Sequence, residues 1–328
     1  MTQCTNTLPS IQAQHSKAEH SPNAVVMIRP HHFTPNPQTA ADNAFQQSPK
    51  LDANTVKEHA YWEVTLAADT LRKHGVTVHI FEDEGHDTPD SVFPNNWFST
   101  HATGQIGLYP MYCENRRRER NPNIIAFLTS HYRVSETVDY SHYEHKNIVL
   151  EGTGSMVLDN QNKIAYAVKS KRMNETLFAQ FCQDFHYQPL AFDASDEKGV
   201  PIYHTNVLMC LGTRFALIGL SLIDDVVTRN KVRNAIEETG KELIELSHEQ
   251  IQHFAGNALE LQTHKGRILA ISQTAFNALT HPQISAITKH VKIVPLDVAT
   301  LEMAGGSIRC MLAGIHLEKK STSKNKSA

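Results

Sequence analysis

Five helix-to-strand junctions recur along the chain at intervals of about 50–55 residues, near the upper end of the periods found in repeat architectures. The expected helices, each with the strand that comes after it, are 54–74 with 76–82, 123–131 with 134–140, 174–185 with 189–193, 225–239 with 242–246, and 282–290 with 291–296. This regularity predicts one domain of five similar β/α units. The alternative is two domains of unrelated α+β segments that happen to be evenly spaced.

Turn residues predict a hairpin in four of the five units. The hairpins are expected at 103–105, 159–162, 212–213 and 264–266, where Gly or Asn supplies the turn chemistry. The fifth unit, 307–317, begins with a β-like run from Ser307 to Ala313 and lacks a second strand. Residues 24–29 could supply that strand, and the five units would then close into a ring.

Bulk properties exclude several classes of protein. A formal net charge of -3 argues against a nucleic-acid or membrane-surface role driven by charge. Residues 1–22 are polar and do not resemble a secretory signal, and no apolar stretch is long enough to span a bilayer. The 5 cysteines are odd in number and scattered without a C-x-x-C pair, which favours reduced thiols in a cytoplasm. The oligomeric state stays open, and a homo-oligomer is possible.

The ends of the chain differ in composition from its centre. Residues 1–22 and 319–328 are rich in Ser, Asn, Lys and Gln, and both are expected to be disordered tails. The catalytic domain is therefore predicted to span residues 23–318.

Polar residues stand at nearly the same phase of each unit, in the loops after the five strands. Loops on a rigid scaffold tend to carry function, so these five are expected to converge at one mouth. The candidates, in chain order, are Asp90 and Asn96 in the first loop, Glu151 in the second, His204 and Asn206 in the third, Asn257 (a weak candidate) in the fourth and Cys310 in the fifth.

Cys310 is the candidate nucleophile. Gly305 and Gly306 precede it and allow a tight turn with positive φ. A cysteine after such a turn can be held rigidly and still be reached by a small ligand. A nucleophilic cysteine needs a base and a group that orients the base, and His204 and Glu151 are available for these roles.

These residues can also be explained without catalysis, by packing or by metal binding. Cysteine is often simply buried, and Cys113, Cys182 and Cys210 lack the glycine setting of Cys310. A metal site could use His86, Asp87, Asp90 and His204, but no H-x-x-x-H or H-E-x-x-H pair has a useful spacing. Neither a metal nor another cofactor is therefore expected.

Glu151, His204 and Cys310 in this order, with the five repeats, resemble the guanidine-modifying, or pentein, superfamily, which includes arginine deiminase, dimethylarginine dimethylaminohydrolase and the amidinotransferases. The resemblance covers about residues 24–317 and implies an α/β fold, a five-bladed pseudo-symmetric propeller in a single domain. It implies that Glu151, His204 and Cys310 are catalytic. It also implies that arginines hold the substrate α-carboxylate, for which Arg117 and Arg172 are the nearest matches.

Three further stretches, Arg29-Pro30, 93–98 and 115–117, resemble one branch of this superfamily, the citrulline-utilising hydrolases. Arginine deiminases hold the cationic guanidinium with aspartates where this chain has Asn96 and Asn206. An amide offers a donor and an acceptor without charge, which suits a neutral ureido group, and Asp90 remains to accept from substrate N–H groups.

The resemblance therefore implies a hydrolase of arginine and citrulline metabolism. It would convert L-citrulline to ornithine, ammonia and carbon dioxide through a covalent cysteine intermediate, and its expected small-molecule partner is a citrulline-like amino acid. One alternative is an arginine deiminase or another guanidine hydrolase. The other is a non-catalytic binding module, since the same fold serves both purposes.

Overall fold

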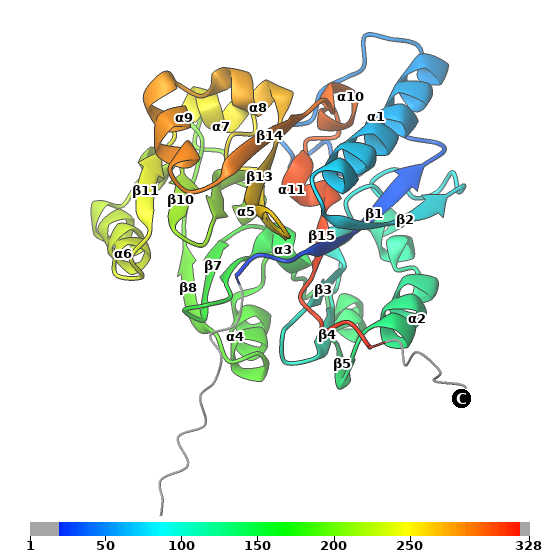
Figure 1. The fold of residues 1–328 in the computed structure, drawn as a ribbon, viewed down its shortest axis with the longest axis horizontal. Coiled ribbons are helices and arrows are strands. Elements are labelled where there is room, and N and C mark those ends of the chain that lie inside the picture. The colour runs from blue at the N-terminus through cyan, green and yellow to red at the C-terminus, as the bar shows by residue number, and fades with distance from the viewer. Residues whose placement is uncertain (1–19, 322–328) are drawn as a thin grey trace, which may run out of the picture.

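The computed structural model describes residues 20–321, which form five small three-stranded sheets around a common centre, with helices on the outside (Figure 1). The predicted five-unit α/β propeller is confirmed. Each sheet contains one strand that lies next to the corresponding strand of a neighbouring unit, as β15 does with β3, and β9 does with β6 and β12. We call these five, β3, β6, β9, β12 and β15, the inner strands.

The first unit shows the pattern that all five share. Its inner strand β3 (Phe98–Thr100) pairs antiparallel with β4 (Gln105–Leu108) through a short hairpin. Helix α2 (Pro122–His131) then crosses over, so that β5 (Glu136–Asp139) pairs parallel with β4. Parallel neighbours require a long crossover and antiparallel ones do not, which explains why a helix stands only between the second and third strands.

The other units have the same order. The second has β6 (Val157–Asp159), β7 (Ile164–Val168), α4 (Glu175–Asp184) and β8 (Gln188–Phe192), and the third has β9 (Met209–Leu211), β10 (Phe215–Ile218), α6 (Val226–Glu237) and β11 (Glu242–Glu245). The fourth has β12 (Leu259–Thr263), β13 (Gly266–Ser272), α8 (Gln273–Ala278), α9 (His281–Thr288) and β14 (Lys292–Leu296). Short helical turns lie in the connections within and between the units: η1 (Pro94–Asn96), η2 (Asn115–Glu119), η3 (Ser141–Lys146), α3 (Gly152–Ser155), α5 (Thr205–Leu208), η4 (Leu220–Leu222), α7 (His248–Gln252), α10 (Ala299–Glu302) and α11 (Ile308–Met311).

The fifth unit joins the two ends of the described chain. Its inner strand β15 (Ala313–Ile315) pairs antiparallel with β1 (Ala24–Pro30), and β1 pairs parallel with β2 (Thr77–Asp83) after α1 (Ala53–Lys73). The predicted ring closure by the N-terminal strand is therefore confirmed.

The β-like run expected from Ser307 to Ala313 is wrong over most of its length. Residues Ile308–Met311 form the helical turn α11, and the strand begins only at Ala313. The Asn257 side-chain oxygen accepts from the backbone N–H groups of Arg309 (3.0 Å) and Cys310 (3.4 Å), which stabilises the turn in place of a strand ladder.

Local sequence explains the long helices. Side chains of Asp52, Asn174, Asp225 and Thr280 accept from backbone N–H groups of the first turns of α1, α4, α6 and α9. In α1, apolar residues from Val56 to Leu71 recur at helical spacing and are buried against the fifth sheet. The helices begin and end within a few residues of their predicted bounds, as frayed ends allow.

Residues just outside the predicted domain bounds of 23–318 also pack against the propeller. His20 is buried and its ring Nε2 lies 2.8 Å from the Leu211 carbonyl, while the Pro22 carbonyl accepts from the Gln262 backbone N–H. At the other end Lys320 donates its backbone N–H to His131. The remainder of both predicted tails lies outside the described residues. Across residues 20–321, no helix has the length and apolar character needed to cross a membrane.

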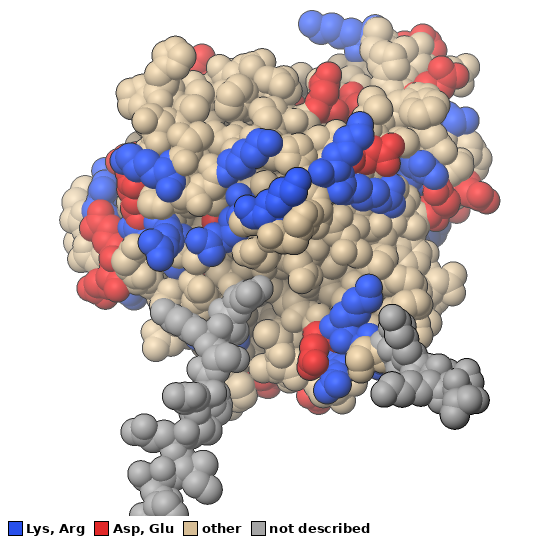
Figure 2. Space-filling view, in the orientation of Figure 1, with Lys and Arg blue, Asp and Glu red and all other residues tan. Residues whose placement is uncertain are grey.

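Charges of both signs share the face shown in Figure 2. Lysine and arginine side chains form a band across it, and acidic side chains lie beside the band. This mixture agrees with the small net charge of the sequence.

Candidate active site

The predicted polar residues stand just before the inner strands, and the structure brings most of them to one pocket. Its wall includes Asp90, Asn96, His204 and Cys310, and its cavity volume is about 10 Å³. A cavity of this volume holds about one water molecule, so the surrounding side chains nearly fill the site. The remaining lining residues are Thr39, Asn43, Phe93, Arg116, Arg172, Tyr203, Ala304 and Gly306.

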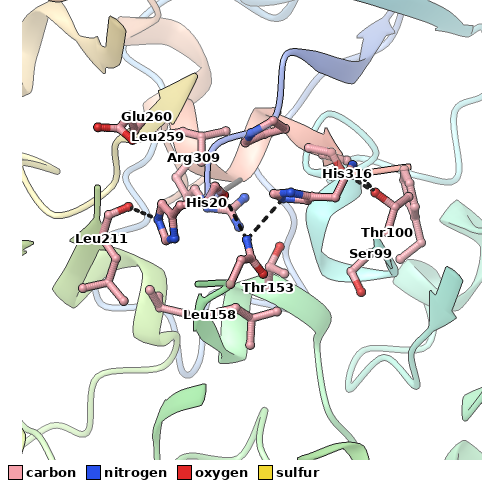
Figure 3. A pocket seen from close by; sticks show the side chains of 16 residues that line it. His20, Ser99, Thr100, Thr153, Leu158, Leu211, Leu259, Glu260, Arg309 and His316 are labelled. Carbon is pink, nitrogen blue, oxygen red and sulfur yellow. Dashed lines mark hydrogen bonds between the residues drawn. The ribbon is translucent and has the colours of Figure 1, made fainter. Parts of the chain in front are cut away.

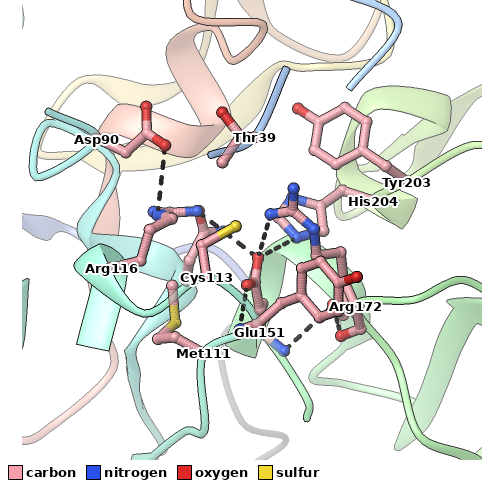
Figure 4. A network of polar contacts seen from close by, with 12 residues as sticks. Thr39, Asp90, Met111, Cys113, Arg116, Glu151, Arg172, Tyr203 and His204 are labelled. Carbon is pink, nitrogen blue, oxygen red and sulfur yellow. Dashed lines mark hydrogen bonds and ion pairs between the residues drawn. The ribbon is translucent and has the colours of Figure 1, made fainter. Parts of the chain in front are cut away.

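Glu151 lies at the centre of the polar network shown in Figure 4 and is fully buried. One carboxylate oxygen accepts from the Tyr112 backbone N–H at 2.8 Å. The other lies 2.8 Å from His204 Nε2 and 3.1 Å from Arg172 Nη1. Burial alone would raise the pKa of Glu151, but Arg172, the His204 hydrogen bond and Arg116 together lower the pKa, so the group is an anion.

Two glycines after Glu151 make room for this network. Gly152 has φ of +42°, and a Cβ there would lie 2.6 Å from the Asn95 carbonyl oxygen. A Cβ on Gly154 would lie 2.1 Å from Asn96 Nδ2 and 2.8 Å from His204 Nδ1. Neither contact is tolerable, so the turn requires glycine at both positions.

His204 is buried, and its tautomer can be deduced from its partner. Burial lowers the pKa of His204, although the hydrogen bond to Glu151 opposes this, so the ring is neutral at neutral pH. The Glu151 carboxylate can only accept, so Nε2 of the ring carries the hydrogen. The free lone pair is then on Nδ1, which is the atom of His204 that can take a proton.

Cys310 lies on α11 after the predicted glycine turn, and Gly305 has the expected positive φ, +81°. Its side chain is 2% exposed, and its sulfur is 3.2 Å from Asn206 Nδ2 and 3.3 Å from Asn257 Nδ2. Both amide groups donate toward the sulfur, which accepts from them and is held in place.

Asn257, a weak candidate from sequence, has more contacts than expected. Besides its contact with the sulfur and with the backbone of α11, it donates to the Asn206 carbonyl at 2.9 Å. The sequence signal for a stronger role was its position just before the inner strand β12, which matches the positions of the other candidates in their units.

The other three described cysteines do not line the pocket. Burial raises the pKa of Cys113 to about 11 and the pKa values of Cys182 and Cys210 to about 12. Thiols that stay protonated are poor nucleophiles, so these three suit packing roles.

Arg116 lines the pocket, whereas Arg117, the residue named from sequence, does not. The Arg116 guanidinium is buried and bonds both carboxylate oxygens of Glu119, at 2.9 and 3.0 Å. Its Nη2 also donates to Asn96 Oδ1 at 3.0 Å. Arg117 turns away and donates to the Met111 carbonyl. Sequence reasoning also missed Glu119.

Arg172 lies in the pocket wall as predicted, but protein carboxylates surround it. Its Nε and Nη2 donate to the two oxygens of Asp42 at 2.9 and 2.7 Å, and its Nη1 donates to Glu151. The rings of Tyr112 and Tyr203 lie 5.3 and 5.7 Å from the guanidinium carbon.

Three buried side-chain atoms of the predicted substrate-binding residues have no hydrogen-bond partner among residues 20–321. They are Asp90 Oδ1, Asn96 Nδ2 and Asn206 Oδ1. Buried polar atoms are normally paired, so these three indicate groups that a ligand completes. Burial also raises the pKa of Asp90, against the attraction of Arg116. Within residues 20–321, no group of three or more His, Cys, Asp or Glu side chains is placed to hold a metal ion.

A second cavity, with a volume of about 50 Å³, lies between the inner strands (Figure 3). Residues of all five inner strands line it, together with His20, Arg309 and His316. Burial lowers the pKa of His316 to about 3 and also lowers the pKa of His20. We call this space the axial cavity.

Comparison with known proteins supports this architecture. Residues 29–317 match the family model described as "N,N dimethylarginine dimethylhydrolase, eukaryotic". A search of curated protein sequences gave no significant match.

Solved structures share the fold at low sequence identity. The N-terminal domain of ArgZ, an arginine dihydrolase from cyanobacteria, was solved as a cysteine-to-serine mutant with bound substrate. It is 15% identical with a TM-score of 0.69, and the match covers 89% of this chain and 97% of that one. Unliganded AgrE is 17% identical, with a TM-score of 0.69 and coverage of 89% and 39%. A citrulline complex of the dimethylarginine hydrolase DDAH from Pseudomonas aeruginosa is 11% identical, with a TM-score of 0.59 and coverage of 90% and 100%.

Proposed function

The chain belongs to the N,N-dimethylarginine dimethylhydrolase family, in the pentein superfamily of hydrolases that act on amidino-type C–N bonds, and from this premise we propose that it hydrolyses the ureido group of L-citrulline. Cys310, His204 and Glu151 are the proposed catalytic residues. Asp90, Asn96, Asn206 and Arg172 are the proposed binding residues, and Arg116 takes the place first given to Arg117.

The orientation of the Asn96 amide carries the preference for a ureido group. Arg116 can only donate, so Asn96 must present its oxygen to Arg116 and its NH₂ group away from it. That unpaired NH₂ group is a donor, while the unpaired atom of Asp90 is an acceptor. A ureido group offers one C=O acceptor and several N–H donors and satisfies both, whereas a guanidinium has only donors.

The proposed chemistry starts with the transfer of the thiol proton to His204 Nδ1. The Cys310 sulfur then forms a bond to the ureido carbon, and backbone N–H groups or an asparagine amide hold the developing oxyanion. Glu151 stabilises the imidazolium and fixes its orientation. The proton on His204 passes to the departing nitrogen as its C–N bond breaks.

Either nitrogen of the ureido group can depart first. If ornithine departs, a carbamoyl thioester remains, and water activated by His204 releases carbamate, which decomposes to ammonia and carbon dioxide. If ammonia departs, an alkylthiocarbamate remains, and its hydrolysis gives ornithine and carbon dioxide. One water is consumed by either route.

A guanidino substrate is the second candidate, and the charge of the site favours it. The carboxyl groups of Asp42, Asp90, Glu119 and Glu151 outnumber the guanidinium groups of Arg116 and Arg172, four to two. An excess of acids would attract a cation such as arginine or a methylated arginine.

Product analysis with purified protein separates these functions. L-citrulline, L-arginine and N,N-dimethylarginine are supplied separately, with Cys310→Ala as the blank. We expect ornithine and ammonia from citrulline and loss of turnover in Cys310→Ala with the fold retained. Citrulline formed from either arginine would establish the guanidine hydrolase instead. No product from any substrate would leave a non-catalytic binding module.

A further inference from the structure

The irregular segment 31–52 between β1 and α1 covers the pocket. Thr39 and Asn43 line the pocket directly, and the Asn36 side chain donates to Asp90 at 2.8 Å. Asn43 and Gln47 anchor the segment to α10 and the turn after it, through the backbone carbonyls of Ala304 and Met303. These contacts fix the segment over the pocket, where Arg116 and Arg172 form part of the wall.

Asp42, within this segment, makes a two-pronged ion pair with Arg172. Both carboxylate oxygens accept, at 2.9 Å from Nε and 2.7 Å from Nη2. Such forked pairing is also the preferred way for arginine to bind a free carboxylate. Asp42 thus occupies the edge of Arg172 that a substrate α-carboxylate would use.

No other part of the Arg172 guanidinium is free to bind a substrate carboxylate. Its side chain is 1% exposed, Glu151 takes a hydrogen bond from Nη1, and the rings of Tyr112 and Tyr203 lie beside the guanidinium. A substrate carboxylate could reach it only by replacing a protein group. Glu151 is fully buried, whereas the Asp42 side chain is 12% exposed, so Asp42 is the partner that can leave.

Charge balance leads to the same conclusion. The site already holds four carboxyl groups against two guanidinium groups, and burial raises the pKa of Asp90 and raises the pKa of Glu119 to about 8. A fifth carboxylate would add like-charge repulsion in a buried site. Exchange of Asp42 for the substrate carboxylate leaves the number of buried charges unchanged.

We propose that Asp42 is an internal stand-in for the substrate α-carboxylate and determines which ligands open the site. The inference rests on the proposed function, in which Arg172 receives that carboxylate. Only a ligand whose carboxylate lies at the right distance from its reacting carbon can replace Asp42 on Arg172. The Asp42–Arg172 ion pair thus selects amino acids over simple ureas, and it lowers the apparent affinity for the substrate because Asp42 must first be displaced.

The test compares wild type with Asp42→Asn, with Asp42→Glu as a charge-retaining variant and Glu58→Gln as a matched control. Glu58 is exposed on α1, and its side chain makes no hydrogen bond or ion pair within residues 20–321. The first readout needs no substrate: the rate of Cys310 alkylation by iodoacetamide, measured by peptide mass spectrometry. The second is kcat and KM with whichever of citrulline, arginine or dimethylarginine the wild type turns over. Thermal unfolding confirms that each variant is folded.

We expect Asp42→Asn to alkylate about tenfold faster and to lower KM about tenfold, equivalent to ~1.4 kcal/mol, with kcat within about twofold. Asp42→Glu should lie between Asp42→Asn and wild type, and Glu58→Gln should match wild type. Unchanged alkylation by a folded Asp42→Asn would overturn the inference. A raised KM would also overturn it, since Asp42 would then bind the substrate. If the protein does not act on citrulline, only the proposed function is contradicted, because the alkylation result does not depend on any substrate.

Discussion

His204 and His316 both lie inside the propeller, but His204 is buried and His316 lines the axial cavity, where it is partly exposed. His204, in the pocket, has its Nε2 2.8 Å from the Glu151 carboxylate. His316, in the axial cavity, has Asn160 as its side-chain neighbour, at 3.5 Å, and lies near the positive charges of Arg309 and Lys163. Burial lowers the pKa of both, but in His204 a carboxylate opposes the effect.

The difference shows what makes a buried histidine useful as a base. Enclosure alone yields a ring that stays neutral and cannot keep a proton, as in His316. A paired carboxylate restores the ability to hold a proton for part of a reaction cycle. Glu151 can fill this role because Arg172 and Arg116 keep it ionised.

The largest expected effect comes from removing that carboxylate. Glu151→Gln should reduce kcat by roughly a thousandfold or more, because the imidazolium loses its counter-charge and the ring its fixed tautomer. The protein should also be less stable, since two buried arginines lose an anionic partner. Steady-state kinetics and thermal unfolding measure the two effects.

A pH profile separates this role from simple destabilisation. In wild type the acid limb of kcat/KM should lie below pH ~6.5, the ordinary histidine value, because burial lowers the His204 pKa. In Glu151→Gln the limb should move to still lower pH. A limb that stayed in place would mean that Glu151 does not act through His204.

A smaller effect is expected at the substrate end of the pocket. Asn96→Asp keeps an oxygen for Arg116 but replaces the unpaired donor with a charged acceptor. The ratio of kcat/KM for arginine to that for citrulline should rise by about 10–100-fold. Asn96→Ala is the control, and it should lower kcat/KM for both substrates without reversing the preference between them. Equal shifts in the two variants would contradict the role of the amide.

The smallest effect concerns stability against pH in the axial cavity. The folded pKa of His316 lies below the unfolded value, so the unfolded chain binds the extra proton between pH ~6.5 and pH ~3. Stability is therefore present above pH ~6.5 and is lost as pH falls, at no more than about 1.4 kcal/mol per pH unit for this one group.

His316→Gln should reduce this slope while leaving activity and stability at pH ~7 nearly unchanged. Urea unfolding at pH ~7 and pH ~4 would measure it, with the exposed His264→Gln as the control. A slope equal to that of wild type would show that other groups, such as His20 and His101, account for the acid sensitivity.

Sequence periodicity predicted the parts of the molecule that repeat. The five units, the ring closure and the meeting of Glu151, His204 and Cys310 all depend on backbone phase, which a repeat preserves. Side-chain direction cannot be deduced from phase. Arg116 and Arg117 are adjacent in η2, where neighbours point about 120° apart, so a one-residue error exchanges a pocket residue for a surface one.

The parts without periodicity could not be predicted. Asp42 belongs to an irregular segment whose path depends on contacts with distant residues, such as the anchor of Gln47 on Met303. His20 was assigned to a tail on composition alone, and its burial depends on Leu211, far along the chain. Such contacts are properties of the tertiary structure and leave no local pattern.

The pairing of β1 with β15 has a consequence for biosynthesis. Strand β1 can complete its sheet only after residues 313–315 have been made. During translation the growing chain must therefore leave one edge of this apolar strand unpaired and open to aggregation or chaperones, even after β2 has paired with its other edge. The pairing also spans nearly the whole described chain, so folding of the last unit should be slow.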